Sequence, residues 1–198
     1  MSRHLILLAA LLTMLTACGR SAPTRYYLLE SALGPVQADG LPARSLRVAQ
    51  VNVPEYLDRS GIVSRVDGKS RLIIAEFHAW AEPLSHGIRR VFQETLTPPL
   101  LAGGVSVLPS GDEDSGDFTL LLDIQRLDGN FDEKAVLEAH WSLRNRDETI
   151  LGRGIYAAEE MVRGKSYDVL VNAESSLVRR MAQYLSEKLP PLMAGKKP

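Results

Sequence analysis

Two segments in the second half of the chain alternate apolar and polar residues with a period of two. They cover residues 118–125 and 134–143. This alternation is typical of antiparallel strands that bury one face and expose the other. Turn-forming residues at 128–130 join the two segments, and those at 144–147 lead into a further strand candidate at 150–161. We therefore predict three consecutive antiparallel strands.

Two other segments carry apolar residues at helical spacing. One follows Pro83 and the other covers residues 167–189. Such spacing makes one apolar stripe, which a helix buries against a core. Proline pairs at 98–99 and 190–191 predict where the helices end, because proline disrupts a helix interior. The stripes consist of Leu84, Ile88, Val91, Phe92 and Leu96 in the first segment and of Leu170, Leu177, Met181, Tyr184 and Leu185 in the second.

Short apolar runs predict further strands in the first half of the chain. Asp67-Gly68 between two of these runs is a strong hairpin signal. The expected fold class is α+β, a single domain in which a mostly antiparallel β-sheet is packed by two main α-helices. We place the domain at residues 25–190 and expect a disordered tail at 191–198. The short strands are predicted at 26–29, 46–53, 62–66, 71–75 and 105–108.

The N-terminus has the pattern of a lipoprotein signal. Arg3 precedes an apolar run at 5–15, which is too short to span a bilayer, and Leu15-Thr16-Ala17-Cys18 follows. We predict a signal peptide at 1–17, lipidation of Cys18 and a tether at 18–24. The alternative is a buried helix whose last turn holds a cysteine. Gly19, in place of the aspartate that retains enterobacterial lipoproteins at the inner membrane, favours the periplasmic face of the outer membrane.

Composition narrows the classes of function. The 198 residues carry a formal net charge of −1, and no basic stripe predicts nucleic-acid binding. The chain has one cysteine, which lipidation would consume. The mature domain would then have no disulfide, thiol nucleophile or cysteine-based metal site. It would depend on packing alone for stability.

No segment predicts catalysis, a metal site or a cofactor. The acidic stretch at 112–117 fails the register of a calcium loop, so we interpret it as a solvated turn. His78, His86 and His140 lack zinc-site spacing, and we interpret them as ordinary surface histidines. No Gly-x-Ser-x-Gly elbow is present in the sequence.

Two short segments combine large apolar residues with loop positions. Tyr56 and Leu57 lie in one, and Trp80, Pro83 and Leu84 lie between a strand and a helix. Tryptophan is enriched at the centres of protein interfaces, so these five residues are candidate partner-binding residues. The alternative is that they determine the fold, with Trp80 fixing the entry of the helix. We expect Trp141, on an alternating face, to be core.

Four motifs follow the signal along the chain. They are Tyr26-Tyr27-x-Leu29; Val51-x-Val53-Pro54-x-Tyr56-Leu57 with Gly61-Ile62-Val63; Trp80-Ala81-x-Pro83-Leu84 with Ile88-Arg89; and Leu127-x-Gly129 with Trp141-x-Leu143. In their order and spacing these motifs resemble a known family, the ABC-type transport auxiliary lipoproteins of the PqiC (YmbA) group. The resemblance extends over essentially the whole mature chain.

The resemblance implies a non-enzymatic role at the outer membrane. Family members are accessory and docking subunits for a mammalian-cell-entry (MCE) domain protein and its inner-membrane permease. That system is thought to move lipids between the membranes or to support envelope integrity. A ring-shaped partner would suit a homo-oligomer of this chain. Two other hypotheses remain: a lipoprotein regulator of a periplasmic cell-wall synthase, and an envelope enzyme.

Overall fold

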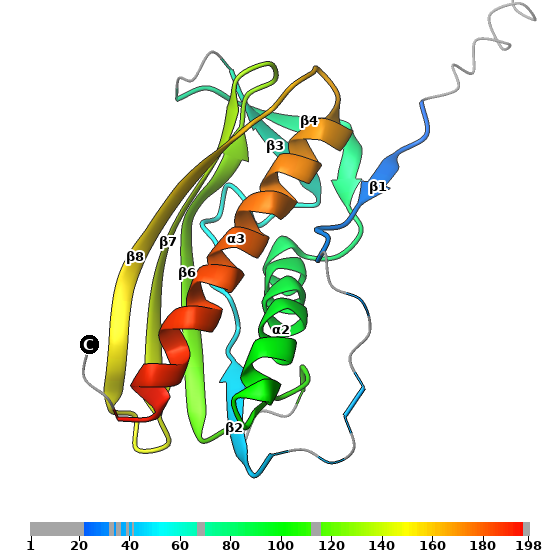
Figure 1. Ribbon diagram of the computed structural model, residues 1–198. Helices are drawn as coiled ribbons and strands as arrows, with labels where there is room; N and C mark the ends of the chain where they lie inside the picture. The colour runs from blue at the N-terminus through cyan, green and yellow to red at the C-terminus, as the bar shows by residue number, and fades with distance from the viewer. Residues whose placement is uncertain are drawn as a thin grey trace, which may run out of the picture.

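The computed structural model describes residues 22–31, 34, 37–38, 40, 42–66, 70–111 and 116–195. Eight strands form one sheet, and two long helices cover one face of its longest strands (Figure 1). The helices are α2 (Leu84–Ala102) and α3 (Tyr167–Met193). The strands are β1 (Arg25–Tyr27), β2 (Arg44–Val48), β3 (Gly61–Arg65), β4 (Leu72–Trp80), β5 (Val105–Val107), β6 (Phe118–Gly129), β7 (Lys134–Asn145) and β8 (Ile150–Met161).

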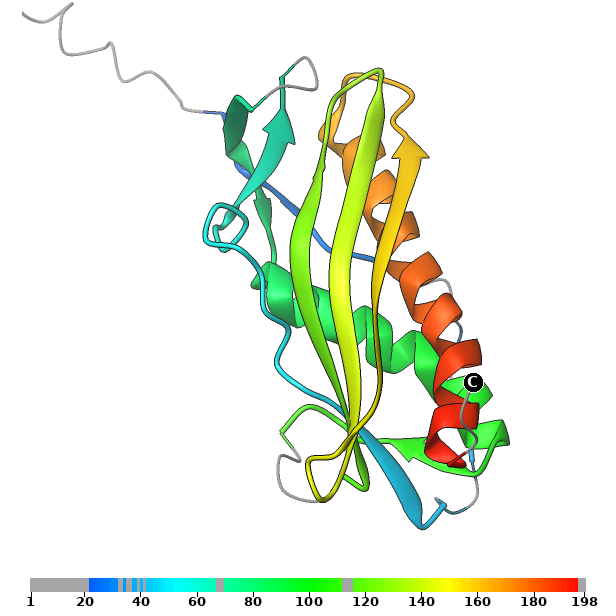
Figure 2. The same ribbon diagram turned by 90° about the vertical axis from the view of Figure 1, so that its left-hand side faces the viewer.

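The predicted trio of long antiparallel strands is confirmed as β6, β7 and β8. Apolar residues on one face of β6 and β7 alternate with more polar residues on the other. The apolar set packs beneath the helices, and Leu120, Ile124, Leu137 and Leu143 are each at most 1% exposed. Ser166 caps α3 by accepting a hydrogen bond from the Val169 amide. Figure 2 shows the opposite, uncovered face of these strands.

The sheet is mixed, so the prediction of a mostly antiparallel sheet was wrong. Four of the seven pairings between described strands are parallel: β1 with β4, β2 with β5, and both β2 and β3 with β6. β2 and β3 share one edge of β6, one near each end. Alternation of apolar and polar residues shows which face of a strand is buried. It does not show which strands lie beside it or whether they run parallel or antiparallel, because these depend on contacts between distant residues.

Both helices continue through their proline pairs, contrary to the predicted ends. α2 includes Pro98 and Pro99 and buries Leu100, and α3 includes Pro190 and Pro191 and buries Met193. Each proline removes one backbone donor. Burial of the last turn offsets that loss, and Arg44 also donates to the Met193 carbonyl at 2.7 Å. Residues 191–193 are therefore helical, not a disordered tail, while 196–198 lie outside the described residues.

The predicted β3–β4 hairpin is present as an antiparallel pair, although its turn at 67–69 lies outside the described residues. The same holds for the predicted signal peptide, for Cys18 and for residues 112–115. Among the described residues, no helix combines the length and apolar character needed to cross a membrane.

Candidate functional site

The structure brings together the two segments that the sequence analysis selected. The loop at 54–60 contains a turn in which the Leu57 amide donates to the Pro54 carbonyl at 2.8 Å. The Trp80 amide donates to the Ser60 carbonyl at 2.7 Å, so the loop lies against the junction between β4 and α2. We call this region the loop–junction site.

The five candidate partner-binding residues differ in exposure. Leu57, Trp80 and Leu84 are 2%, 8% and 3% exposed and belong to the main core. Tyr56 is half-buried and Pro83 is exposed. Three of the five therefore pack the fold and position the loop and the junction. A contact of these residues with a partner stays a prediction.

An open hollow of about 310 Å³ separates the loop from the junction. Trp80 contributes to its lining, and the exposed residues around it carry both signs of charge. A hollow of this kind suits a protruding side chain of a partner better than a buried small molecule. Its lining residues are Asp58, Arg59, Ser60, Trp80, Ala81, Glu82 and Pro83.

A buried carboxylate holds the loop to the sheet. Asp128, at the end of β6, is fully buried and accepts a hydrogen bond from the Tyr56 hydroxyl at 3.0 Å. Arg65 donates to both of its oxygens, at 2.8 and 2.6 Å, and Arg126 donates at 2.9 Å. Burial alone would raise the pKa of Asp128, but the two arginines outweigh burial and lower it. Burial and the adjacent carboxylate raise the pKa of Tyr56.

A second charged group joins the junction to the N-terminal segment. Arg90 on α2 donates through Nη2 to Glu82 Oε1 and to the Leu29 carbonyl, both at 2.8 Å. Glu82 lies at the edge of the hollow, and Leu29 lies two residues after the end of β1. The chain that leads from the predicted lipid anchor is thereby connected to the loop–junction site.

Sequence reasoning missed Glu174, which lies in the apolar stripe of α3. Its side chain is 1% exposed, and its Oε2 has no hydrogen-bond partner among the described residues. Burial, with a smaller contribution from Asp128, raises its pKa well above the usual range. The signal was present in the sequence, because position 174 falls between Leu170 and Leu177 on the stripe.

A larger hollow of about 640 Å³ lies on the uncovered face of β6–β8. Asp123, His140 and Ser142 line it together, with His140 opposite Asp123 in the strand register. Serine catalysis needs these groups joined by hydrogen bonds of about 2.6–3.2 Å. No hydrogen bond joins any two of the three among the described residues. The hollow therefore lacks an assembled nucleophile and base.

The prediction that all three histidines are ordinary surface residues was wrong for His78. Its Nδ1 lies 2.8 Å from the Tyr27 hydroxyl, and its ring stacks on Tyr167 at 4.2 Å between centroids. His78 thus helps join β1 and β4 to α3, whereas His86 and His140 are exposed. The described residues contain no group of three or more side chains placed to hold a metal ion.

Comparison with known proteins identifies one family whose model matches most of this chain. The model of the family described as ABC-type transport auxiliary lipoprotein component matches residues 26–186. The intermembrane transport lipoproteins PqiC of Escherichia coli and of Shigella flexneri are each 24% identical over 189 residues. The match covers 96% of this chain and 98% of either relative.

Two solved structures share the fold. The crystal structure of an uncharacterized protein has a TM-score of 0.68 and 24% identity, and the match covers 85% of this chain and 99% of that one. A protein from Xanthomonas campestris has a TM-score of 0.66 and 16% identity, with 87% and 98% covered.

Proposed function

This chain belongs to the family of ABC-type transport auxiliary lipoprotein components, and we propose from that premise that it is the outer-membrane accessory and docking subunit of an MCE-type intermembrane lipid transport system. The observation that carries the proposal is the end-to-end match to the PqiC lipoproteins, whose name assigns them to intermembrane transport. In this role the protein supports envelope integrity without catalysing a reaction.

The proposed location follows from the predicted N-terminus. Cys18 carries the lipid, residues 18–24 form the tether, and the domain faces the periplasm from the outer membrane. Its partners are an MCE-domain protein and that protein's inner-membrane permease. A homo-oligomer presenting several copies of one docking surface would match a ring-shaped partner.

We place the docking surface at the rim of the loop–junction site. Asp58, Arg59 and Pro83 are exposed there, and Leu57, Trp80 and Leu84 lie buried beneath or beside them. A rigid apolar base under a mixed-charge rim is the usual anatomy of a protein interface. The Asp128 network supports this arrangement, because it holds Tyr56 and so the loop.

The test is crosslinking in cells that express a tagged full-length protein, followed by identification of the proteins recovered. We expect an MCE-domain protein with its permease. Arg59→Glu should reduce that recovery several-fold, since it reverses a charge at the rim. Arg153→Glu is the matched control, because it reverses an exposed arginine at the larger hollow.

Each other outcome has a distinct meaning. If recovery of the MCE-domain protein falls with Arg153→Glu and not with Arg59→Glu, the docking surface is the uncovered face of β6–β8 and not the loop–junction site. Recovery of a cell-wall synthase instead would favour the regulator hypothesis, and no partner at all would contradict the transport role.

A further inference from the structure

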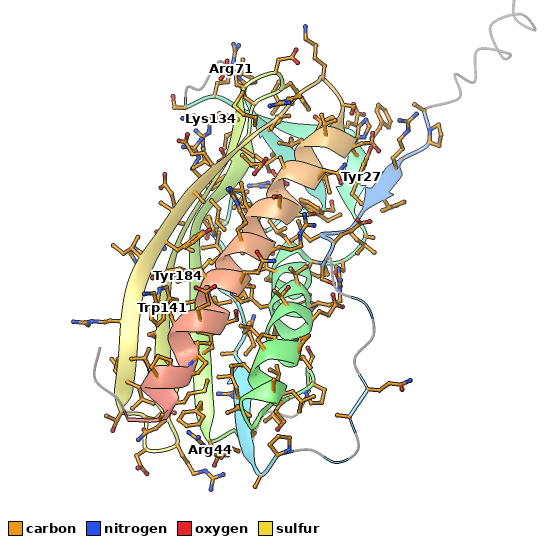
Figure 3. The ribbon with its side chains drawn as sticks, viewed as in Figure 1. Tyr27, Arg44, Arg71, Lys134, Trp141 and Tyr184 are labelled. Carbon is orange, nitrogen blue, oxygen red and sulfur yellow. The ribbon has the colours of Figure 1, made fainter. Side chains whose placement is uncertain are left out.

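The β3–β4 hairpin and the start of β1 lie at the same end of the elongated molecule. Figures 1 and 2 share a vertical axis, and both place these two features at the top and the β7–β8 turn at the bottom. Figure 3 shows Arg71 and Lys134 at the top end and Arg44 at the bottom. We call the top, which also holds the end of β8, the tether end.

Large apolar side chains are exposed at the tether end. On β4, Ile73 and Ile74 are each 50% exposed, although they are consecutive residues. Consecutive strand residues point to opposite faces, so this part of the hairpin presents an isoleucine on both sides. Tyr26 on β1 and Met161 at the end of β8 are exposed as well, at 69% and 58%. A sheet that buried one face of the hairpin would cover one isoleucine of the pair.

Arginines accompany these apolar residues. Arg25 precedes Tyr26, and Arg71 lies two residues before Ile73; both arginines are exposed. A guanidinium binds phosphate through paired donors, and tyrosine places an apolar ring and a polar hydroxyl at the level of lipid headgroups. Arginine, tyrosine and isoleucine together match the layered chemistry of a bilayer surface.

The length of the tether identifies the occupant of this surface. Arg25 lies seven positions after Cys18, and a fully extended chain over that stretch spans about 25 Å. A lipid on Cys18 would therefore keep the tether end within about the thickness of one bilayer from the membrane.

We propose that the β3–β4 hairpin is a membrane-contact element: Ile73 and Ile74 enter the interfacial region of the bilayer that holds the lipid anchor, and Arg25 and Arg71 bind lipid phosphates. This inference rests on the lipidation of Cys18 in the proposed function. It gives the protein a second attachment and sets its orientation, with the β7–β8 turn directed away from the membrane.

The chain allows a clean labelling test. Its single cysteine would be blocked by lipid, so a cysteine introduced into the full-length lipoprotein would be the only free thiol. We would attach an environment-sensitive fluorophore to Ile73→Cys or Ile74→Cys, and to Ile150→Cys as the control. Ile150 matches Ile73 in exposure, at 48%, but begins β8 at the opposite end of the molecule.

The labelled proteins are reconstituted into vesicles of phosphatidylethanolamine and phosphatidylglycerol with brominated acyl chains. We expect a blue-shifted emission at positions 73 and 74 and bromine quenching several-fold stronger than at position 150. Equal quenching at all three positions, with full access to an aqueous quencher, would overturn the proposal. Protection of position 73 only after addition of the solubilised transport partner would overturn it in favour of a protein contact.

Failure of the anchor is recognised separately. The unsubstituted chain should take up no thiol label and should float with the vesicles. A labelled unsubstituted chain that does not float would contradict lipidation of Cys18, and with it the membrane contact. A protein that floats while its hairpin stays in water would overturn the membrane contact alone.

Discussion

Glu174 places a carboxyl group in the buried face of α3, where most neighbours on the stripe are apolar. Its pKa is raised because burial penalises the charged form, and the Asp128 carboxylate adds to this. Asp128 shows the opposite balance, because two arginines and the Tyr56 hydroxyl solvate its charge. The pKa values of two buried acids are therefore shifted in opposite directions because their partners differ.

Glu174→Gln should stabilise the protein at neutral pH. The unfolded chain ionises Glu174 near the ordinary pKa, whereas the folded protein keeps the proton, so folding is penalised as pH rises. Below the unfolded pKa both states are protonated and the penalty vanishes. Above it, the advantage of the variant should grow by about 1.4 kcal/mol per pH unit until the folded pKa is passed.

Urea unfolding of both proteins from about pH 4 to about pH 8 measures this difference. Glu187→Gln, at an exposed position on the same helix, is the control and should leave the pH profile unchanged. Parallel profiles for wild type and Glu174→Gln would show that Glu174 is ionised in the folded protein.

At the scale of elements, close packing of α3 on the sheet depends on glycines in β8. Gly152 lies under Leu192 of α3, and Gly154 lies under the indole of Trp141. Figure 3 shows Trp141 and Tyr184 in the region between the long strands and α3. A Cβ at position 154 would lie 2.9 Å from the indole Nε1, closer than real contacts allow. Glycine at 154 is therefore what permits Trp141 to lie over β8.

Gly154→Ala should destabilise the protein by about 1–3 kcal/mol, because the rigid indole must move within a packed core. Urea unfolding gives the loss of stability, and a shifted tryptophan emission would report the displaced ring. Gly34→Ala is the control, since its added Cβ meets no atom within 4 Å. Equal stability of the Gly154→Ala and Gly34→Ala variants would mean that Trp141 moves without cost.

At the scale of the whole molecule, the N-terminal segment is held by both helices. Leu29 is 2% exposed, and its carbonyl accepts from Arg90 on α2. The Glu30 amide donates to Ser175, and the Glu30 carbonyl accepts from Arg179, both on α3. Any pull from the proposed lipid anchor would therefore reach the core through residues 29–30 and would not act on β1 alone.

Arg90→Ala should loosen this attachment. We expect faster hydrogen exchange at the amides of residues 29–31. The free energy of unfolding should fall by about 1 kcal/mol, the contribution of a partly exposed charged hydrogen bond. Arg89→Ala is the matched control, because Arg89 has no hydrogen bond or ion pair with other described residues. Unchanged hydrogen exchange in Arg90→Ala would show that the hydrogen bonds of Ser175 and Arg179 with Glu30 are enough to hold the N-terminal segment.

Much of the fold was predictable, and the loop–junction site partly so. Alternation identified β6 and β7, and helical spacing identified α2 and α3, because burial of one face leaves a period in the sequence. The motifs around Tyr56 and Trp80 were selected separately as candidate partner-binding segments, and only the structure shows that the fold places them against each other. The helical stripe indicated burial of Leu84, but the sequence could not show that Leu57 and Trp80 are buried, because neither lies in a segment whose period reports burial.

By itself the sequence determined the class of fold, the family, and which residues form the faces of the long strands and helices. These follow from local patterns and from motif order. Only the tertiary structure decided the parallel pairings on β6, the continuation of both helices through proline, the charge balance at Asp128 and Glu174, and the exposure of Ile73 and Ile74. Each of these depends on residues distant in sequence, whose packing and electrostatic contacts outweigh the local preference.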